Sequence, residues 1–248
     1  MKNEIVSTDP DEIGDFWAKE IYPYLKPIVE ADYRQRPSPI GSAVLIGFRS
    51  KQYLVTAGHV IAPHLGETGA PKGAPYCYLP EQIEIRGPID IVDDPFDLAL
   101  IEVPAAPRPC LRLPQHLALD LRDGELCLFV GLQAREKSWD INPAQATMRP
   151  RPLSYLGTIR RSSPTRFSIG FNDKNLRRSG RKYGAIGKLN GISGAAVYVL
   201  RNDAPRLAGI VIEYHPRRSE LIATSAAALW EMMRQKSLQE TTLRTRFS

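Results

Sequence analysis

The chain has 248 residues, of which 43% are apolar and 24% are charged, and its formal net charge is +6. This composition is that of a globular protein and argues against a disordered or fibrous chain. Three widely spaced cysteines exclude a disulfide framework, and the chain has no Cys-x-x-Cys or Cys/His cluster of the kind that binds structural zinc. We therefore expect reduced thiols, no metal and no cofactor.

The sequence shows no sign of export or membrane insertion. Its first residues lack the apolar segment of a secretory signal, and no apolar run approaches the length of about 18 residues that a membrane span needs. Free thiols persist in a reducing compartment. We therefore expect a cytoplasmic protein that makes no contact with a membrane.

Two helices are predicted near the ends of the chain. The first covers residues 9–22, where Asp9 is a candidate N-cap and apolar residues recur at helical spacing, and Pro23 and Pro27 should end it. The second covers residues 225–236 and has one apolar face, and the residues after it should be frayed.

Between these helices, short apolar and β-branched runs are separated by Gly, Pro, Asp and Ser. They cover residues 43–48, 53–56, 83–85, 98–103, 126–131, 166–171, 195–200 and 208–214. Strands at such spacing, with no long helix between them, predict an all-β barrel or sandwich and argue against alternating βαβ units.

Three short motifs carry candidate catalytic residues. They are TAGH at the end of one predicted strand (residues 56–59), DLAL at the start of another (residues 97–100), and GISGA before a third (residues 191–195). Asp97 is favoured over the nearby Asp93 and Asp94, because it alone leads directly into an apolar strand. Each motif is weak by itself, whereas all three in this order on a β-rich background are a strong signal.

These residue types suit nucleophilic catalysis by a serine. A serine hydroxyl becomes a good nucleophile when a neutral histidine removes its proton, and a carboxylate can orient that histidine and stabilise its charged form. The negative oxygen that develops on the substrate needs preorganised donors, usually backbone N–H groups, and a glycine two residues before the serine allows the tight turn that points them inward. The motifs therefore predict His59, Asp97 and Ser193 as a catalytic triad, with the N–H groups of Gly191 and Ser193 as the oxyanion hole.

On these motifs the sequence resembles the trypsin-like (chymotrypsin-fold) serine peptidases, over roughly residues 38–236. The resemblance implies an all-β fold of two packed six-stranded antiparallel β-barrels, with the histidine and aspartate from the first and the serine from the second. The implied parts are an N-terminal helical extension (1–37), a first barrel (38–110), a second barrel (111–222), and a C-terminal helix and tail (223–248).

One departure from the secreted members of this family concerns activation. Those members carry an aspartate before the serine that pairs with a freed N-terminus, and Ile192 stands in its place here. Activation by N-terminal cleavage is therefore not expected, and the chain is more similar to bacterial cytoplasmic members. The resemblance implies a serine endopeptidase that cleaves selected intracellular proteins through an acyl-enzyme, under the control of a partner or trigger.

The resemblance also suggests which residues bind the substrate. Gly187 would lie at the base of the first specificity pocket, where it offers no charge for Arg or Lys. Ile212, Glu213 and Tyr214 would form the pocket wall and pair with the substrate backbone. Tyr214 would fill the pocket and favour a small substrate side chain there. Glu213 would attract a basic residue at a neighbouring position of the substrate.

Positive charge is concentrated in residues 149–188, which hold eleven Lys or Arg and one acid, Asp173. This basic stretch is either a solvated surface or a docking surface for a regulatory protein or another acidic partner. It does not show the aromatic interleaving typical of single-strand binders, so nucleic acid is not an expected partner.

Two alternative functions remain open at this point. An intact triad can occur in a catalytically quiescent domain of the same fold that acts as a protein-binding module. An esterase could also use the same three residues.

Overall fold

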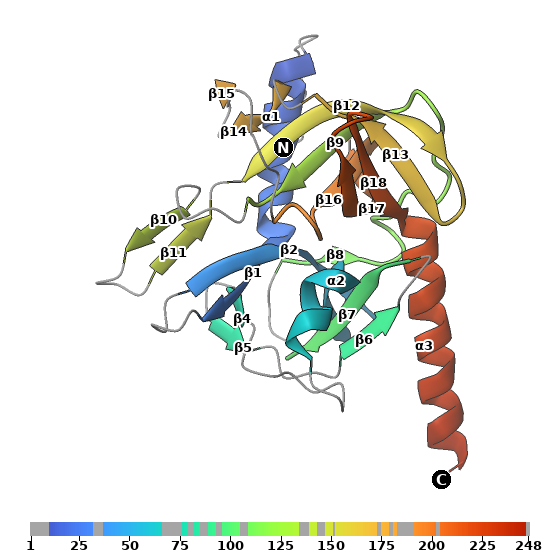
Figure 1. The fold of residues 1–248 in the computed structure, drawn as a ribbon. Helices are drawn as coiled ribbons and strands as arrows, with labels where there is room; N and C mark the ends of the chain where they lie inside the picture. Colours follow the sequence, from blue (N-terminus) through green and yellow to red (C-terminus); the bar gives the residue numbers. More distant parts are fainter. Residues whose placement is uncertain are drawn as a thin grey trace, which may run out of the picture.

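The computed structural model describes residues 10–31, 37–65, 76–78, 82–84, 89–92, 96–104, 109–133, 139–142, 147–150, 152–172, 175–178, 181–182, 191–201 and 204–246. Strands dominate these residues, two sheets form the two halves of the body, and the C-terminal helix runs along one side (Figure 1). Within the described ranges, no helix is long and apolar enough to cross a bilayer.

The described chain begins with α1 (Pro10–Ile21), η1 (Tyr22–Tyr24) and β1 (Leu25–Ala31). Helix α1 agrees with the predicted N-terminal helix. Strand β1 was not predicted, and it lies inside the segment expected as a helical extension. It pairs antiparallel with β2 (Pro37–Phe48), so it belongs to the first sheet. Pro27 is tolerated because only Ile28 and Val29 of β1 pair on the other side of the strand.

The first sheet has eight strands. Its order is β5 (Gln82–Glu84), β4 (Tyr76–Tyr78), β1, β2, β3 (Lys51–Ala57), β7 (Leu98–Val103) and β6 (Ile89–Val92), and β8 (Leu111–Arg112) pairs parallel with β2. No pairing among the described strands joins the two ends of this path. The expected six-stranded closed barrel is therefore not confirmed for the first half.

The second sheet closes on itself. Its path is β13 (Arg166–Gly170), β18 (Glu220–Ser225), β17 (Ala204–His215), β16 (Ala196–Arg201), β9 (Leu126–Gly131) and β12 (Leu153–Ser162), and β12 pairs again with β13. These strands form a six-stranded barrel, as predicted for the second half. Two short strands, β14 (Arg177–Arg178) and β15 (Arg181–Lys182), extend from β12, and β10 (Trp139–Asn142) and β11 (Thr147–Pro150) form a separate hairpin.

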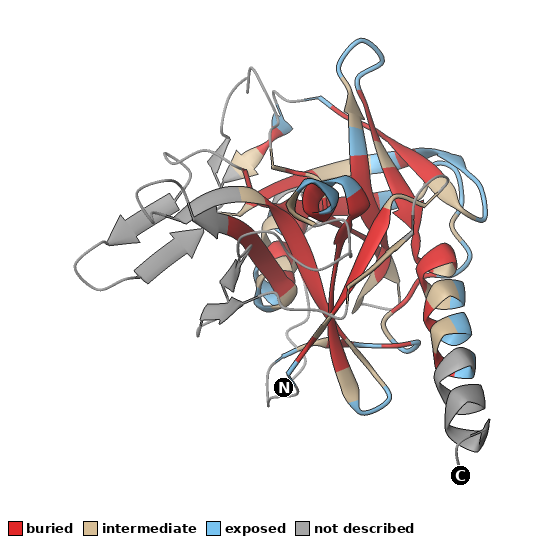
Figure 2. Ribbon diagram, turned by 60° about the horizontal axis from the view of Figure 1, so that its bottom comes forward, coloured by how far each residue is buried: buried red, intermediate tan, exposed pale blue. Residues whose placement is uncertain are grey.

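Buried residues lie along the strands of both halves (Figure 2). In one apolar cluster, Val44 and Leu98 of the first half are joined by Leu128 and Tyr198 of the second half and by Ile21 of α1. Burial of such side chains stabilises a fold by about 1.5–3 kcal/mol each. Because one cluster contains residues of both halves, the same burial that stabilises each sheet also holds the halves together.

Helix α3 (Ala226–Arg246) begins where β18 ends. The hydroxyl of Ser225 accepts a hydrogen bond from the N–H of Ala228 at 3.1 Å, which is the predicted N-cap. The helix continues beyond Lys236, where the sequence predicted its end. Lys236 forms an ion pair with Asp90 of β6, so α3 lies along the first half (Figure 1).

Candidate active site

Strand pairing in the first sheet brings His59 and Asp97 together. β3 and β7 are antiparallel neighbours, with Ala57 opposite Leu98. His59 lies in the short helix α2 (Gly58–Ile61) directly after β3, and Asp97 directly precedes β7. This register places the two residues side by side, although 38 positions separate them in the sequence.

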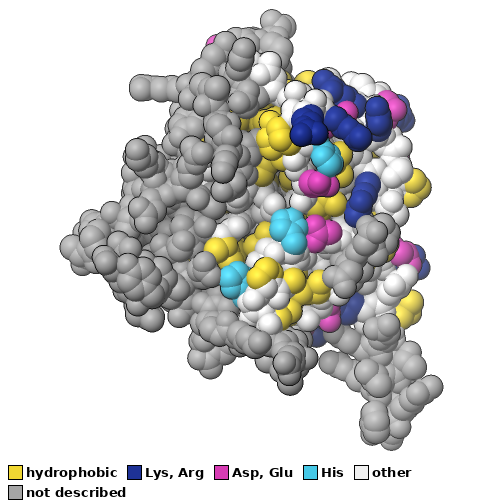
Figure 3. Space-filling model, in the orientation of Figure 1, with side chains coloured by type: hydrophobic (Ala, Val, Ile, Leu, Met, Phe, Trp, Pro, Cys, Tyr) yellow, Lys and Arg dark blue, Asp and Glu magenta, His cyan; other side chains and the backbone are white. Residues whose placement is uncertain are grey.

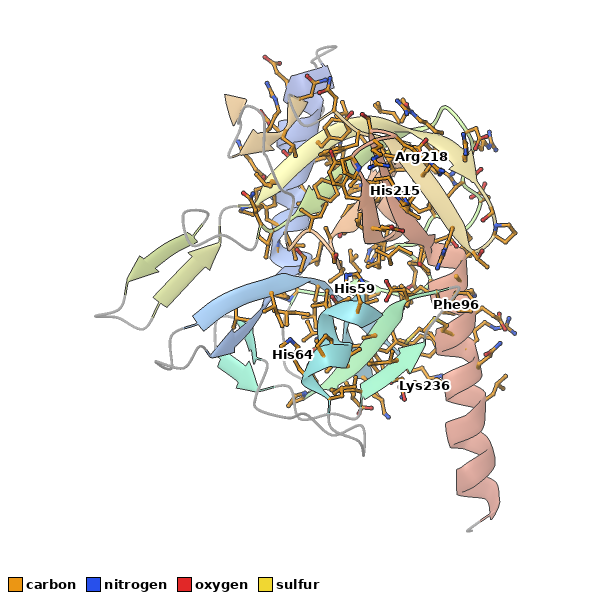
Figure 4. The ribbon with its side chains drawn as sticks, viewed as in Figure 1. His59, His64, Phe96, His215, Arg218 and Lys236 are labelled. Atoms are coloured by element: carbon orange, nitrogen blue, oxygen red, sulfur yellow. The ribbon has the colours of Figure 1, made fainter. Side chains whose placement is uncertain are left out.

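The imidazole of His59 lies between a carboxylate and a hydroxyl. Its Nδ1 is 2.7 Å from Oδ2 of Asp97, and its Nε2 is 2.9 Å from Oγ of Ser193. The backbone N–H of His59 also donates to Oδ1 of Asp97 at 2.9 Å. Figure 4 shows His59 at the junction of the two halves. The side chain of His59 is 50% exposed, so a substrate can reach it.

These contacts shift the pKa values of both partners. The hydrogen bond with Asp97 is the main cause that raises the pKa of His59; burial opposes it, and the charges of Asp97 and Glu213 add to it. Burial by itself would raise the pKa of Asp97, but the bonds from the ring and backbone of His59, with the charges of His59 and Arg166, lower it below its ordinary value. Asp97 is therefore ionised at neutral pH, and His59 is a stronger base than a free imidazole.

Ser193 lies in a tight turn just before β16. The N–H of Ala195 donates to the carbonyl oxygen of Ile192 at 2.9 Å and closes the turn. The N–H of Gly194 donates to the carbonyl oxygen of Val211 on β17 at 2.8 Å. The loop of residues 191–195, which we call the nucleophile loop after the predicted role of Ser193, is thus attached to β17 of the second barrel.

Two glycines of the nucleophile loop occupy conformations that other residues rarely adopt. The φ angles of Gly191 and Gly194 are 86° and 83°. A Cβ atom at Gly194 would lie 1.9 Å from the carbonyl oxygen of Ser42, so no side chain fits there. The N–H groups of Gly191 and Ser193, which the motifs predicted as the oxyanion hole, donate to no residue among those that the structure describes.

Ser42, on β2, is a residue of the site that sequence reasoning did not single out. Its N–H donates to the carbonyl oxygen of Ser193 at 3.0 Å, and its own carbonyl oxygen accepts a bond from Oγ1 of Thr56 at 2.7 Å. Its fully buried hydroxyl accepts the N–H of Leu132 at 2.9 Å and donates to the carbonyl oxygen of Gly191 at 3.2 Å, with the Leu132 carbonyl oxygen further away at 3.4 Å. Ser42 directly precedes the predicted strand of residues 43–48, but nothing in the sequence around it indicates contacts about 150 positions away.

Three residues that the resemblance assigned to substrate binding lie on β17. This strand pairs with β16 only as far as Ile210, whereas its pairing with β18 continues to His215. Residues 212–215 therefore form an edge that extends beyond the end of β16. Gly187, the fourth residue of that group, lies outside the described residues.

The side chains on this edge have different surroundings. Ile212 is buried with the apolar residues of the first half. Glu213 is exposed, and its Oε2 lies 3.2 Å from Nε2 of His215. Tyr214 packs edge-on against Phe171 with ring centroids 5.4 Å apart.

A hollow of about 400 Å³ lies beside His59. Besides His59, it is lined by Ile40, Val60, Pro63, His64, Gly191 and Ser193. His64 belongs to η2 (Ala62–His64), which follows α2. Among the described residues, no three His, Cys, Asp or Glu side chains lie close enough together to hold a metal ion.

Comparison with known proteins finds similarity in structure only. No family model matches the chain, and no curated protein matches its sequence. Among solved structures, the inactive form of Rv3671c from M. tuberculosis H37Rv, a serine-to-alanine mutant, is 15% identical with a TM-score of 0.53, and the match covers 94% of this chain and 96% of that one.

Two further similar structures are proteases. The serine endoprotease from Yersinia pestis is 17% identical with a TM-score of 0.56, and the match covers 93% of this chain and 67% of that one. The HtrA-type protease AlgW with a tripeptide is 19% identical with a TM-score of 0.52, and the match covers 89% of this chain and 62% of that one. At such identities the similarity shows the fold alone: the chain has the chymotrypsin-like fold that the motifs predicted.

Proposed function

We propose that this chain is a serine endopeptidase, with His59, Asp97 and Ser193 as its catalytic triad. One observation carries the proposal: an imidazole stands 2.9 Å from a serine hydroxyl and 2.7 Å from a carboxylate. Side chains in this arrangement can generate a nucleophile at neutral pH. The chymotrypsin-like fold supports the proposal, because the similar structures include serine endopeptidases.

The proposed reaction passes through an acyl-enzyme. Oγ of Ser193 attacks the carbonyl carbon of the peptide bond while Nε2 of His59 takes the hydroxyl proton. The imidazolium, stabilised by Asp97, then gives this proton to the leaving amine as the C–N bond breaks. In the second half of the reaction, Nε2 of His59 takes a proton from water while the water oxygen attacks the acyl carbon of the ester on Ser193. The bond from that carbon to Oγ then breaks, the imidazolium returns its proton to Oγ, and the carboxylic acid product leaves.

The oxyanion formed in each half-reaction would be bound by the N–H groups of Gly191 and Ser193. Both groups are unoccupied by any described residue, and the positive φ of Gly191 gives the loop its tight turn. A donor of this kind is worth about 10²–10³ in kcat. We assign the oxyanion hole to these two groups.

We further propose that the substrate pairs with residues 212–215, the edge of β17 beyond β16. The ring of Tyr214, which packs on Phe171, would occupy part of the space for the side chain before the cleaved bond, so a small side chain is favoured there. The hollow beside His59 would receive the residues after the cleaved bond.

Labelling with a fluorophosphonate probe tests the proposed nucleophile. The wild type and Ser193→Ala are compared with Ser163→Ala, which removes an exposed serine on the turn between β12 and β13. We expect the wild type and Ser163→Ala to be labelled and to cleave a peptide library, and Ser193→Ala to do neither.

The same experiment distinguishes the alternatives. A wild-type protein that neither labels nor cleaves would contradict the proposal and favour a quiescent binding domain. A protein that labels and hydrolyses esters, but leaves every library peptide intact, would be an esterase.

A further inference from the structure

The proposed substrate edge leads from the nucleophile toward exposed arginines. The bond from Gly194 to Val211 shows where β17 passes the nucleophile loop, and the strand then continues to His215. A turn over residues 216–219 follows, in which the N–H of Arg218 donates to the carbonyl oxygen of His215 at 3.2 Å. His59, His215 and Arg218 follow one another along the same side of the molecule (Figure 4).

Three arginines lie on or beside this turn. Arg217 and Arg218 are exposed on the turn itself. Arg160 of β12 lies beside it, because its Nη1 is 3.8 Å from Oε1 of Glu220, the residue that follows the turn. We call Arg160, Arg217 and Arg218 the arginine face. Figure 3 shows a cluster of Lys and Arg side chains on this face of the molecule, and Figure 4, in the same orientation, labels Arg218 and His59.

Only part of this charge is balanced by acids. Glu220, whose side chain is 8% exposed, pairs with Arg160, and Glu213 lies against His215 at 3.2 Å, whereas Arg217 and Arg218 form no ion pair with a described residue. The basic stretch of the sequence is divided by the fold, because Arg177 turns away to form an ion pair with Asp15 of α1 at 2.9 Å. The arginine face therefore combines residues from inside and outside that stretch and presents positive charge to solvent.

We propose that the arginine face selects substrates that carry acidic residues on the N-terminal side of the cleaved bond. This inference rests on the proposed function. A peptide that pairs antiparallel with β17, with its reacting carbonyl at Ser193, has its N-terminal residues directed toward His215. At about 3.3 Å per residue, the side chains roughly four to six positions before the bond reach the turn. Asp or Glu at these positions would meet Arg217 and Arg218, and Lys or Arg would be repelled.

Peptide binding to the Ser193→Ala protein tests this without cleavage. Three fluorescent peptides share one sequence, with Ala before the bond, and carry Glu, Ser or Lys at the fourth to sixth positions before it. Their dissociation constants are measured by anisotropy for Ser193→Ala alone and for two double charge reversals in that background. One is Arg217→Glu with Arg218→Glu; the control, Lys19→Glu with Arg234→Glu, makes the same charge change at exposed positions of α1 and α3.

The expected result is a preference that depends on the arginine face. Ser193→Ala should bind the Glu peptide about tenfold more tightly than the Ser peptide, since each exposed ion pair contributes up to about fivefold. Reversal at Arg217 and Arg218 should abolish this preference and favour the Lys peptide. The control pair of reversals should keep the original order, and added salt should weaken the preference.

Several outcomes would overturn the inference. Equal affinity for the Glu and Ser peptides would do so, and so would an equal loss of discrimination in the control variant. Tighter binding of a single-stranded oligonucleotide through the same arginines would assign the face to nucleic acid instead. Probe labelling of the wild type separates this inference from the proposed function. If the wild type is labelled but Ser193→Ala binds the three peptides equally, the proposed activity stands and the inference fails. If Ser193→Ala prefers the Glu peptide but the wild type is not labelled, the charge preference stands and the proposed activity fails.

Discussion

Replacing Ser42 with alanine should separate the positioning of the nucleophile loop from the presence of the triad. The buried hydroxyl holds the carbonyl oxygen of Gly191 at 3.2 Å and accepts the N–H of Leu132 at 2.9 Å. Alanine removes both bonds but keeps the backbone bond from residue 42 to Ser193 at 3.0 Å. The substitution therefore loosens Gly191, a proposed oxyanion donor, and changes none of the three triad side chains.

The size of both effects follows from these bonds. Losing one net hydrogen bond costs about 1 kcal/mol, and a buried N–H left without its acceptor costs about 1–3 kcal/mol. The free energy of unfolding should thus fall by roughly 2–4 kcal/mol, and Tm by roughly 4–16 °C for a chain of this length. In the reaction, a donor that must be reordered at a cost of about 1–2 kcal/mol lowers kcat by about 5–30-fold.

Ser168→Ala is the matched control, because Ser168 is also buried but its hydroxyl has no hydrogen-bond partner among the described residues. kcat and KM are measured for both variants well below the lower Tm, with a peptide taken from the library. Ser42→Ala should lower kcat and leave KM within about twofold, and Ser168→Ala should change neither. Hydrogen exchange should become faster over residues 191–195 in Ser42→Ala alone.

The reasoning would be refuted by a kcat for Ser42→Ala within twofold of that for Ser168→Ala. A loss confined to KM would refute it as well, because the hydroxyl lies behind the loop and touches no substrate. Faster exchange spread evenly over the second barrel would show that the substitution destabilises the fold without a specific effect on Gly191.

Activity should be lost on acidification at a pH above the ordinary imidazole pKa of 6.5, because the pKa of His59 is raised and the base is protonated as the pH falls through it. Glu213→Gln removes one cause of that rise, so the acidic limb of kcat/KM should move to lower pH; an unmoved limb would exclude this influence. Gly194→Ala should yield little folded protein, since its Cβ would lie 1.9 Å from a backbone oxygen, whereas Gly124→Ala, with a φ of 81° and nothing within 4 Å, should cost only about 1–2 kcal/mol. Equal melting temperatures for these two variants would contradict the steric argument. Tyr214→Ala should shift cleavage toward larger side chains before the bond, and an unchanged library profile would show that this ring does not limit the pocket.

The sequence predicted His59 at the end of one apolar strand and Asp97 at the start of another, and the structure places both residues there. Once the strands are neighbours, the pairing of Ala57 with Leu98 brings the two side chains together. The order of those strands in the sheet is not encoded in either motif, and only the family resemblance supplied it. That resemblance also implied a closed first barrel, which the described strands do not form.

The parts that escaped prediction lack a local pattern. In β12, residues 153–155 are all buried and residues 160–162 are all exposed, because one end of the strand lies in the core and the other in solvent. Buried and exposed residues therefore do not alternate along β12, and such alternation is the signal by which a half-buried strand is predicted. β1 was missed because Pro23 and Pro27 indicate the end of a helix. The contacts of Ser42 depend on the docking of two sheets, which no local motif describes.

The division of the site between the halves predicts which of its functions can vary separately. The bond from Ser42 to Ser193, at 3.0 Å, and the contact of His59 with Ser193, at 2.9 Å, both cross the junction of the two halves. A displacement of one half by about 1 Å would lengthen both distances beyond hydrogen-bond range. The alignment of the triad and the position of the nucleophile loop are therefore lost or gained together. The arginine face lies entirely on the second half. In the proposal, its charge affects the binding of substrate residues on the N-terminal side of the cleaved bond and not the chemical step. A partner that binds at the junction should therefore change kcat, whereas one that covers the arginine face should change KM and leave kcat in place.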